Sequence, residues 1–78
     1  LTATVVDVRL IIREALLKRA TAIAVCHNHP SGSTKPSRED DTLTANLVAA
    51  CKVMNICMLD HIIITDTDYY SYNDEGRM

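Results

Sequence analysis

Residues 21–40 read TAIAVCHNHPSGSTKPSRED, and this stretch decides the fold because three kinds of segment follow one another in it. The first nine residues are short, nearly all apolar and rich in small or branched side chains, which is typical of a β-strand buried on both faces. Pro, Ser and Gly punctuate residues 30–36, which predicts a loop. Ser37 and Asp40 have the S-x-x-D spacing of a helix N-terminal box and follow Pro36, so a helix should begin there.

The segment before this stretch has a strand pattern followed by a helix pattern. Residues 2–6 are β-branched and small, which suits a strand, and Asp7 can cap the helix that follows. Between residues 8 and 19 the apolar side chains recur at helical spacing and predict an amphipathic helix. These side chains are Val8, Ile11, Ile12, Ala15 and Leu16.

The segment after this stretch predicts a helix and then a hairpin. The second helix should end near Asn55, and its expected buried stripe is Leu43, Leu47, Ala50 and Met54. Residues 56–65 (ICMLDHIIIT) predict a strand, residues 66–68 a turn and residues 69–72 (YYSY) a short final strand. The order β-α-β-loop-α-β-β predicts an α/β fold, a mixed sheet with flanking helices.

The length of the chain limits it to one small domain. Its 78 residues contain no Trp and no Phe, so the core must be aliphatic, and a core of this size is marginal by itself. The chain begins with Leu1, and its apolar pattern starts almost at once. We therefore expect residues 1–78 to be the C-terminal portion of a single domain whose N-terminal strands are missing.

Charge and cysteine content narrow the classes of partner and compartment. The net charge is −2 and the basic residues are scattered, so nucleic-acid binding is not supported by charge. The three cysteines, Cys26, Cys51 and Cys57, form no CxxC pair, which favours reduced, buried thiols in a cytoplasmic protein. Cys26 should lie in the core, because alternation turns it away from His27. No apolar run is long enough to predict a membrane span.

The histidine pair in the central stretch predicts a metal site. Residues i and i+2 of an extended chain point to the same side, so His27 and His29 should project together. Asp40 lies in the first turn of the following helix, where side chains lean toward the N-terminus and thus toward the loop. Two imidazoles and one carboxylate suit zinc and leave a fourth position for water. The alternative is that Ser37 and Asp40 only cap the helix, and the two roles are compatible.

The combined spacing resembles a known motif. His27-x-His29, seven residues, Ser37, two residues and Asp40 is similar to the JAMM motif of the JAB/MPN metalloprotease superfamily. The wider segments HNHPSG, KPSREDD, LLKRATA and MLDHIII resemble the RadC-type JAB domains of bacteria, and the resemblance covers about residues 5–76. It implies a JAB/MPN, cytidine-deaminase-like architecture and carries an association with DNA repair.

The resemblance also implies a chemistry. One zinc ion would be held by His27, His29 and Asp40, and the Ser37 hydroxyl would help to stabilise an oxyanion during hydrolysis of an amide or isopeptide bond. The motif also needs a glutamate on a strand well before the histidines. Glu14, Glu39 and Glu75 do not match that position, so we expect the catalytic glutamate in the N-terminal strands that this piece lacks.

Three functions therefore stay open. The first is a zinc-dependent hydrolase with an unidentified protein or peptide substrate, and oligomer formation is possible. The second is a noncatalytic interaction or DNA-repair-associated scaffold module, and the third is a metal-binding pseudo-enzyme.

Two further residues have open roles. His61 is either a core residue with a satisfied imidazole or a partner of a metal-bound histidine. Asp60 could also orient an imidazole, but alternation allows only one of the two to face the site. Gly32 should have a positive φ, and the tyrosines at 69, 70 and 72 should pack in the hairpin.

Overall fold

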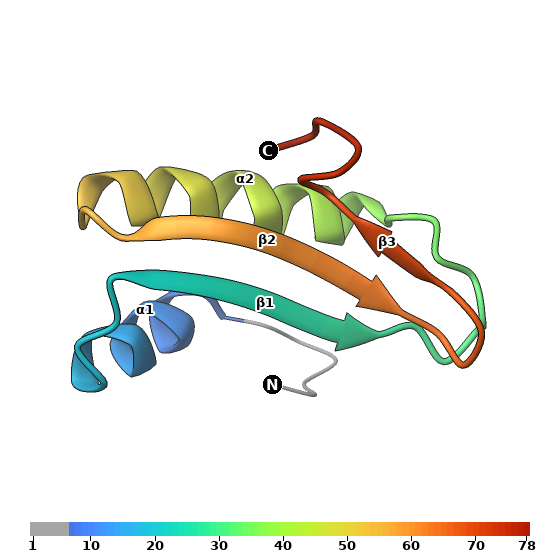
Figure 1. The fold of residues 1–78 in the computed structure, drawn as a ribbon, viewed down its shortest axis with the longest axis horizontal. Helices are drawn as coiled ribbons and strands as arrows, with labels where there is room; N and C mark the ends of the chain where they lie inside the picture. Colours follow the sequence, from blue (N-terminus) through green and yellow to red (C-terminus); the bar gives the residue numbers. More distant parts are fainter. Residues whose placement is uncertain (1–6) are drawn as a thin grey trace.

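The computed structural model describes residues 7–78, which fold into two helices and a three-stranded sheet (Figure 1). The elements are α1 (Val8–Leu17), β1 (Ala22–Asn28), α2 (Arg38–Val53), β2 (Cys57–Ile64) and β3 (Tyr69–Ser71). This order confirms the predicted α/β fold with a mixed sheet. The strand expected at residues 2–6 lies outside the described residues.

The sheet has the order β1-β2-β3, and β2 lies in its centre. β1 and β2 are parallel, while β2 and β3 form the expected antiparallel hairpin. The hairpin turn is closed by a bond from the Thr65 N–H to the Asp68 carbonyl, 2.9 Å long. Because α2 connects two parallel strands, its N-terminus lies at the edge of the sheet where β1 and β2 end (Figure 1). Ligand sites of α/β sheets are commonly found at this edge.

Both helices pack on the same face of the sheet. Ile11 of α1, Val25 of β1 and Leu47 of α2 form one buried cluster, and Ala15, Cys51 and Ile56 form a second. Leu47 has no exposed surface. Because α1 and α2 share one face, the two clusters lie on the same side of the sheet, and Ile23 and Met58 pack against both of them.

The opposite face of β1 is covered by neither helix. Ala24 and Cys26 are exposed there, so burial of residues 21–29 on both faces was a wrong expectation for this chain. The expectation that Cys26 lies in the core was wrong for the same reason, because alternation sends it to the uncovered face. Cys51 is buried as expected, whereas Cys57 is exposed.

The buried stripe of α2 is shifted from the predicted one. It consists of Asp40, Thr44, Leu47 and Cys51, which recur at helical spacing. Leu47 was predicted correctly, but Met54 is 42% exposed and caps the C-terminus. The shift arises because two polar residues, Asp40 and Thr44, take inward positions that an apolar pattern cannot reveal.

A β-bulge in β2 decides which of its side chains face the helices. Ile23 pairs with Met58, but the next residue, Ala24, pairs with Asp60, so Leu59 is an extra residue in β2. An extra residue reverses the alternation beyond it. His61 is consequently buried with no exposed surface, while Leu59 is 52% exposed.

The helix ends follow local sequence signals. Asp7 caps α1 as expected, and its carboxylate accepts from the Arg9 N–H at 2.9 Å. α1 stops at Leu17, two residues before the predicted end, and Arg19 then adopts a positive φ of 53°. α1 has 10 residues and α2 has 16. Neither has the length and apolar character that a membrane crossing requires.

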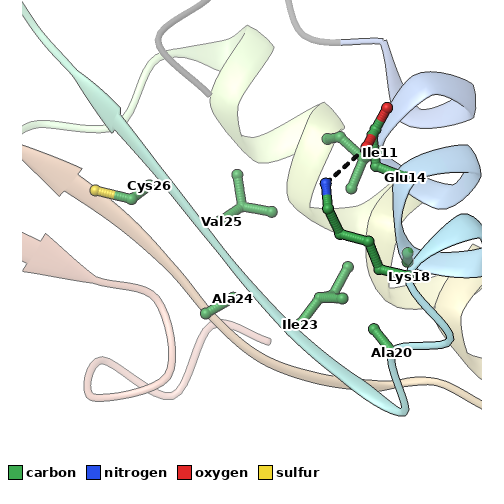
Figure 2. A pocket seen from close by; sticks show the side chains of 9 residues that line it. Ile11, Glu14, Lys18, Ala20, Ile23, Ala24, Val25 and Cys26 are labelled. Atoms are coloured by element: carbon green, nitrogen blue, oxygen red, sulfur yellow. Dashed lines mark hydrogen bonds and ion pairs between the residues drawn. The ribbon is translucent and has the colours of Figure 1, made fainter.

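A hollow of about 200 Å³ lies between α1 and β1 (Figure 2). Its lining is mostly aliphatic, including Ile11 and Val25, and also contains Cys26 and an ion pair between Lys18 and Glu14 at 2.8 Å. The two charges of this pair neutralise one another, and the remaining polar group is a single thiol.

Candidate metal centre

The structure brings the three predicted ligand residues together where β1 ends and α2 begins. His27 is the second-last residue of β1, His29 follows the strand, and Asp40 lies in the first turn of α2. The His27 Nε2 is 2.9 Å from Asp40 Oδ1, and the His29 Nε2 is 3.0 Å from Asp40 Oδ2. The side chains are 11%, 17% and 10% exposed, so the centre is largely buried but retains some access to solvent.

The loop between His29 and Ser37 folds back tightly on the site. The Gly32 N–H donates to the His29 carbonyl at 3.1 Å, and Gly32 has the expected positive φ, 81°. The Ser33 carbonyl then lies 2.9 Å from His29 Nδ1. The turn therefore fixes the orientation of the His29 ring.

Asp40 takes part in a capping box as well as in the site. The Ser37 Oγ accepts from the Asp40 N–H at 3.1 Å, and Asp40 Oδ2 accepts from the Ser37 N–H at 2.7 Å. Burial acts to raise the pKa of Asp40, but the hydrogen bonds from Ser37 and the nearby His27 and His29 outweigh it and lower that pKa. Asp40 is therefore an anion that caps the helix with one oxygen and faces His27 with the other.

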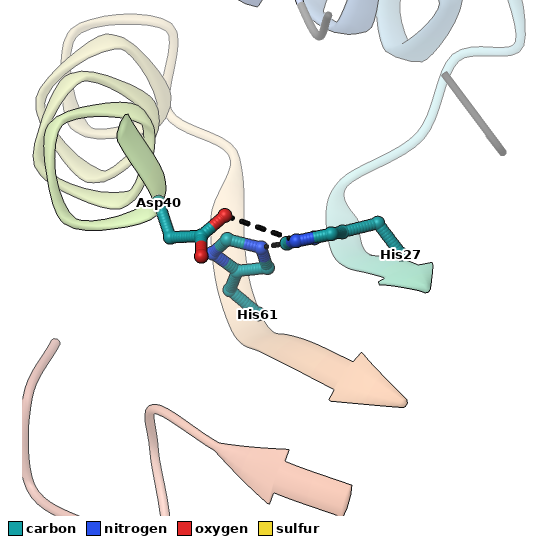
Figure 3. Close-up of side chains that lie close together, drawn as sticks. All are labelled: His27, Asp40 and His61. Atoms are coloured by element: carbon teal, nitrogen blue, oxygen red, sulfur yellow. Dashed lines mark hydrogen bonds and ion pairs between the residues drawn. The ribbon is translucent and has the colours of Figure 1, made fainter. Parts of the chain in front are cut away.

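His61 is the fourth polar side chain at the centre, and Figure 3 shows it between Asp40 and His27. Its Nε2 is 2.9 Å from His27 Nδ1, and its Nδ1 is 2.5 Å from the Thr44 Oγ1. Asp60 faces away and accepts from the Ser71 hydroxyl at 2.5 Å. Of the two residues that alternation left open, His61 thus faces the site, with its imidazole fully satisfied.

Thr44 was not predicted from the sequence. It lies one helical turn after Asp40, and its Oγ1 donates to the Asp40 carbonyl at 2.9 Å. The i, i+4 spacing of the two residues on α2 was the signal that could have found it, since such residues share one helix face.

Hydrogen-bond directions determine which His27 nitrogen is free. The single hydroxyl proton of Thr44 goes to the Asp40 carbonyl, so Thr44 Oγ1 accepts from a protonated His61 Nδ1. A neutral His61 then accepts at Nε2 from a protonated His27 Nδ1. Burial lowers the pKa of both His27 and His61, which favours neutral rings. His27 Nε2 therefore carries a lone pair.

His29 is oriented by the loop instead of by another side chain. The Ser33 carbonyl can only accept, so His29 Nδ1 donates to it and Nε2 is the ring nitrogen that faces Asp40. The Nε2 atoms of His27 and His29 lie 2.9 and 3.0 Å from the two carboxylate oxygens of Asp40. Imidazole nitrogens and a carboxylate are the donors that zinc takes in proteins, and these residues could therefore hold a metal ion.

The two distances are close to those between the ligands of a metal ion. Two ligands about 2.0–2.1 Å from a tetrahedral zinc ion lie roughly 3.3 Å apart, and each histidine nitrogen lies slightly closer than this to Asp40, but to a different carboxylate oxygen. Among the described residues, His27, Asp40 and His61 form a group whose donor atoms all lie within 4.8 Å of one another, and His29 is not part of it. The His61 Nε2 accepts from the His27 N–H, so this hydrogen bond would have to break before His61 could bind a metal ion through that nitrogen.

The parallel β-α-β unit with a histidine-rich centre at its carboxyl edge defines a small α/β domain built around a candidate metal site. A family model described as the RadC-like JAB domain matches residues 1–77. The chain belongs to this family.

Relatives agree with that assignment. UPF0758 proteins of Flavobacterium johnsoniae and Methanosarcina acetivorans are 45% and 46% identical to it over 76 residues, 97% of this chain and 33% of theirs. A UPF0758 protein of Clostridium acetobutylicum is 46% identical over 78 residues, 100% of this chain and 34% of its own length. The chain spans about a third of the length of these relatives.

The described residues place no glutamate in the metal-binding group. Glu14 lies on α1 in its ion pair with Lys18, and Glu39 and Glu75 are exposed. The sequence interpretation that none of the three matches the catalytic glutamate is therefore consistent with where they lie.

Proposed function

We propose that this chain is the metal-binding part of a zinc-dependent hydrolase domain that cleaves amide or isopeptide bonds in a protein or peptide substrate. The observation that carries the proposal is the convergence of the His27 and His29 Nε2 atoms on the carboxylate of Asp40, at 2.9 and 3.0 Å. Membership of the RadC-like JAB family supports it. Two His and one carboxylate leave a ligand position free, which is the arrangement of catalytic rather than structural zinc sites.

Each residue of the centre has a distinct task in this proposal. Bound zinc would supply Lewis-acid polarisation of the substrate carbonyl and would activate a water. His27 and His29 provide neutral nitrogen donors, and Asp40 provides charge. The Ser37 Oγ accepts from the Asp40 N–H, which leaves its own proton free to donate to an oxygen that becomes negative during the reaction.

The proposal needs a proton acceptor from elsewhere in the protein. We infer that residues 1–78 are the C-terminal portion of the domain and that the glutamate lies in N-terminal strands outside this chain. Within residues 7–78, β1 pairs only with β2, and its outer face carries exposed Ala24 and Cys26. An open edge is suited to the addition of further strands, because its backbone N–H and C=O groups are unpaired.

The rival is a metal-binding pseudo-enzyme, which the lack of a glutamate in the described metal group favours. The hydrolase and the pseudo-enzyme differ in whether the zinc-loaded protein cleaves a substrate. A hydrolase loaded with zinc cleaves a peptide or isopeptide library and stops when the metal is chelated, whereas a pseudo-enzyme binds zinc equally well and cleaves nothing.

The test of metal binding is elemental analysis of the protein that carries this chain, after reconstitution with zinc. About one ion per chain is expected, and His27→Ala, His29→Ala and Asp40→Ala should each reduce occupancy strongly. Glu39→Gln is the matched control, because it removes a charge from the same turn of α2 at an exposed side chain that does not touch the centre. Full occupancy in all three alanine variants would overturn the proposal.

A further inference from the structure

We propose that Thr44 and His61 are positioning residues that fix the tautomer of His27 and so present its Nε2 as a metal donor. The inference deepens the proposed function and rests on it only for the metal. The tautomer itself is a property of the metal-free protein, and it can be tested without any ion.

The hydrogen bonds run in one direction. They start at His27 Nδ1, pass through both nitrogens of His61 at 2.9 and 2.5 Å, and reach Thr44 Oγ1. They end at the Asp40 main-chain carbonyl, 2.9 Å from the threonine oxygen. A carbonyl cannot donate, so the terminus sets the direction of every bond before it. If the hydrogen bonds ended at a hydroxyl, which can donate as well as accept, the direction of donation could reverse. His27 would then carry its proton on Nε2.

Packing prevents His61 from escaping this arrangement. His61 has no exposed surface, and its ring stacks on Tyr72 with centroids 4.8 Å apart and planes 3° from parallel. The Tyr72 hydroxyl donates to Asp41 at 2.7 Å, and Arg77 pairs with the same carboxylate at 2.9 Å. The ring plane of His61 is therefore held from the side while Thr44 and His27 hold its two nitrogens.

These bonds also link the side chains of the centre into a closed ring of contacts. Thr44 binds the main chain of Asp40, whose side chain faces His27, and His27 contacts His61. His27 is thus connected through His61 and Thr44 to the backbone of Asp40. A merely structural His61 would need satisfied nitrogens but would impose no particular tautomer on His27, and this difference is measurable.

The experiment uses ¹⁵N-labelled, metal-free protein at a pH where the imidazoles are neutral. Long-range ¹H–¹⁵N correlation spectra assign the protonated nitrogen of each ring. In the wild type, His27 should be protonated on Nδ1. Thr44→Val, which keeps the shape and removes the hydroxyl, should move His27 wholly or partly to the Nε2–H tautomer. Thr44→Ser should restore the wild-type spectrum, and Thr42→Val, an exposed threonine on the same helix, should change nothing.

Zinc affinity, measured by competition with a chelator, gives the second readout. Thr44→Val should weaken binding about 10- to 100-fold, the usual cost of losing a partner of a metal-bound histidine, and Thr44→Ser should recover most of it. A wild-type His27 protonated on Nε2 would overturn the inference, as would unchanged spectra and affinity in a folded Thr44→Val variant. If the wild type keeps the Nδ1–H tautomer but binds no zinc, the proposed function fails and the positioning role stands.

Discussion

Tyr72 lies flat against His61, with the two ring centroids 4.8 Å apart and the ring planes 3° from parallel. Only 1% of Tyr72 is exposed. Its hydroxyl donates to Asp41, the residue next to Asp40 in the first turn of α2. The segment after β3 is therefore part of the support of the centre, although it reads in the sequence as the end of a hairpin followed by a tail.

The stability of the fold should fall in alkali because of Tyr72. Burial, together with the hydrogen bond to Asp41, raises the pKa of Tyr72 above its usual value of 10.0. The unfolded chain therefore loses this proton first, and the free energy of unfolding decreases as the pH rises above about 10, by up to about 1.4 kcal/mol per pH unit. Urea unfolding between pH 8 and 11 measures the decrease. Tyr72→Phe keeps the stacked ring and should flatten it, whereas parallel curves for the two proteins would contradict this assignment.

Local signals were sufficient to predict most of the fold. Proline and glycine punctuation located the loop, Asp7 and Ser37 marked the two helix starts, and helical and strand periodicities identified the elements. These features depend on neighbours in the sequence, so they can be recognised without knowledge of the tertiary structure. The proximity of His27, His29 and Asp40 was predictable for a similar reason, because the three residues lie within one strand-loop-helix unit.

The features that were missed depend on long-range packing. The bulge at Leu59 has no signature in a run of apolar residues, yet it determines that His61 faces the site. The shift of the α2 stripe toward Thr44 is favoured only because His61 on another strand supplies a partner. The exposure of Cys26 depends on which helices cover the sheet, and periodicity within one strand does not contain that information.

The three cysteines should differ sharply in reactivity. Cys26 and Cys57 are exposed, while Cys51 is buried, and burial raises the pKa of the Cys51 thiol. Fewer thiolates and less access both slow alkylation. Brief iodoacetamide treatment at pH 8, followed by peptide mass spectrometry, should label Cys26 and Cys57 and leave Cys51 unmodified until urea is added. Rapid labelling of Cys51 under native conditions would show that the packing between α2 and the sheet is looser than described.

The core should be sensitive to truncation at Leu47. This side chain has no exposed surface and lies between Ile11 and Val25. Leu47→Ala should lower the free energy of unfolding by about 2–5 kcal/mol, a large share of what a small domain possesses. Leu17→Ala is the matched control, since Leu17 is 67% exposed and its truncation should cost little. Equal losses in thermal or urea unfolding for the two variants would refute the described core.

Asp40→Asn should separate the two roles of Asp40. The amide oxygen can still accept from the Ser37 N–H, which now binds Asp40 Oδ2 at 2.7 Å. The amide nitrogen would replace Oδ1 opposite His27 Nε2 and could donate to its lone pair. The metal-free variant should therefore be at least as stable as the wild type. Zinc binding should be lost, because the only anionic ligand of the centre has been removed.

Asp40→Ala provides the comparison, since it loses the capping bond as well as the ligand. It should lower the free energy of unfolding by about 1 kcal/mol even without metal. Urea unfolding of the metal-free proteins and calorimetric zinc titration measure the two effects. If Asn destabilises the metal-free protein as much as Ala, the contact between His27 Nε2 and Asp40 is an attractive hydrogen bond, which contradicts the assignment of the His27 proton to Nδ1. If Asn binds zinc as the wild type does, Asp40 serves only to cap α2.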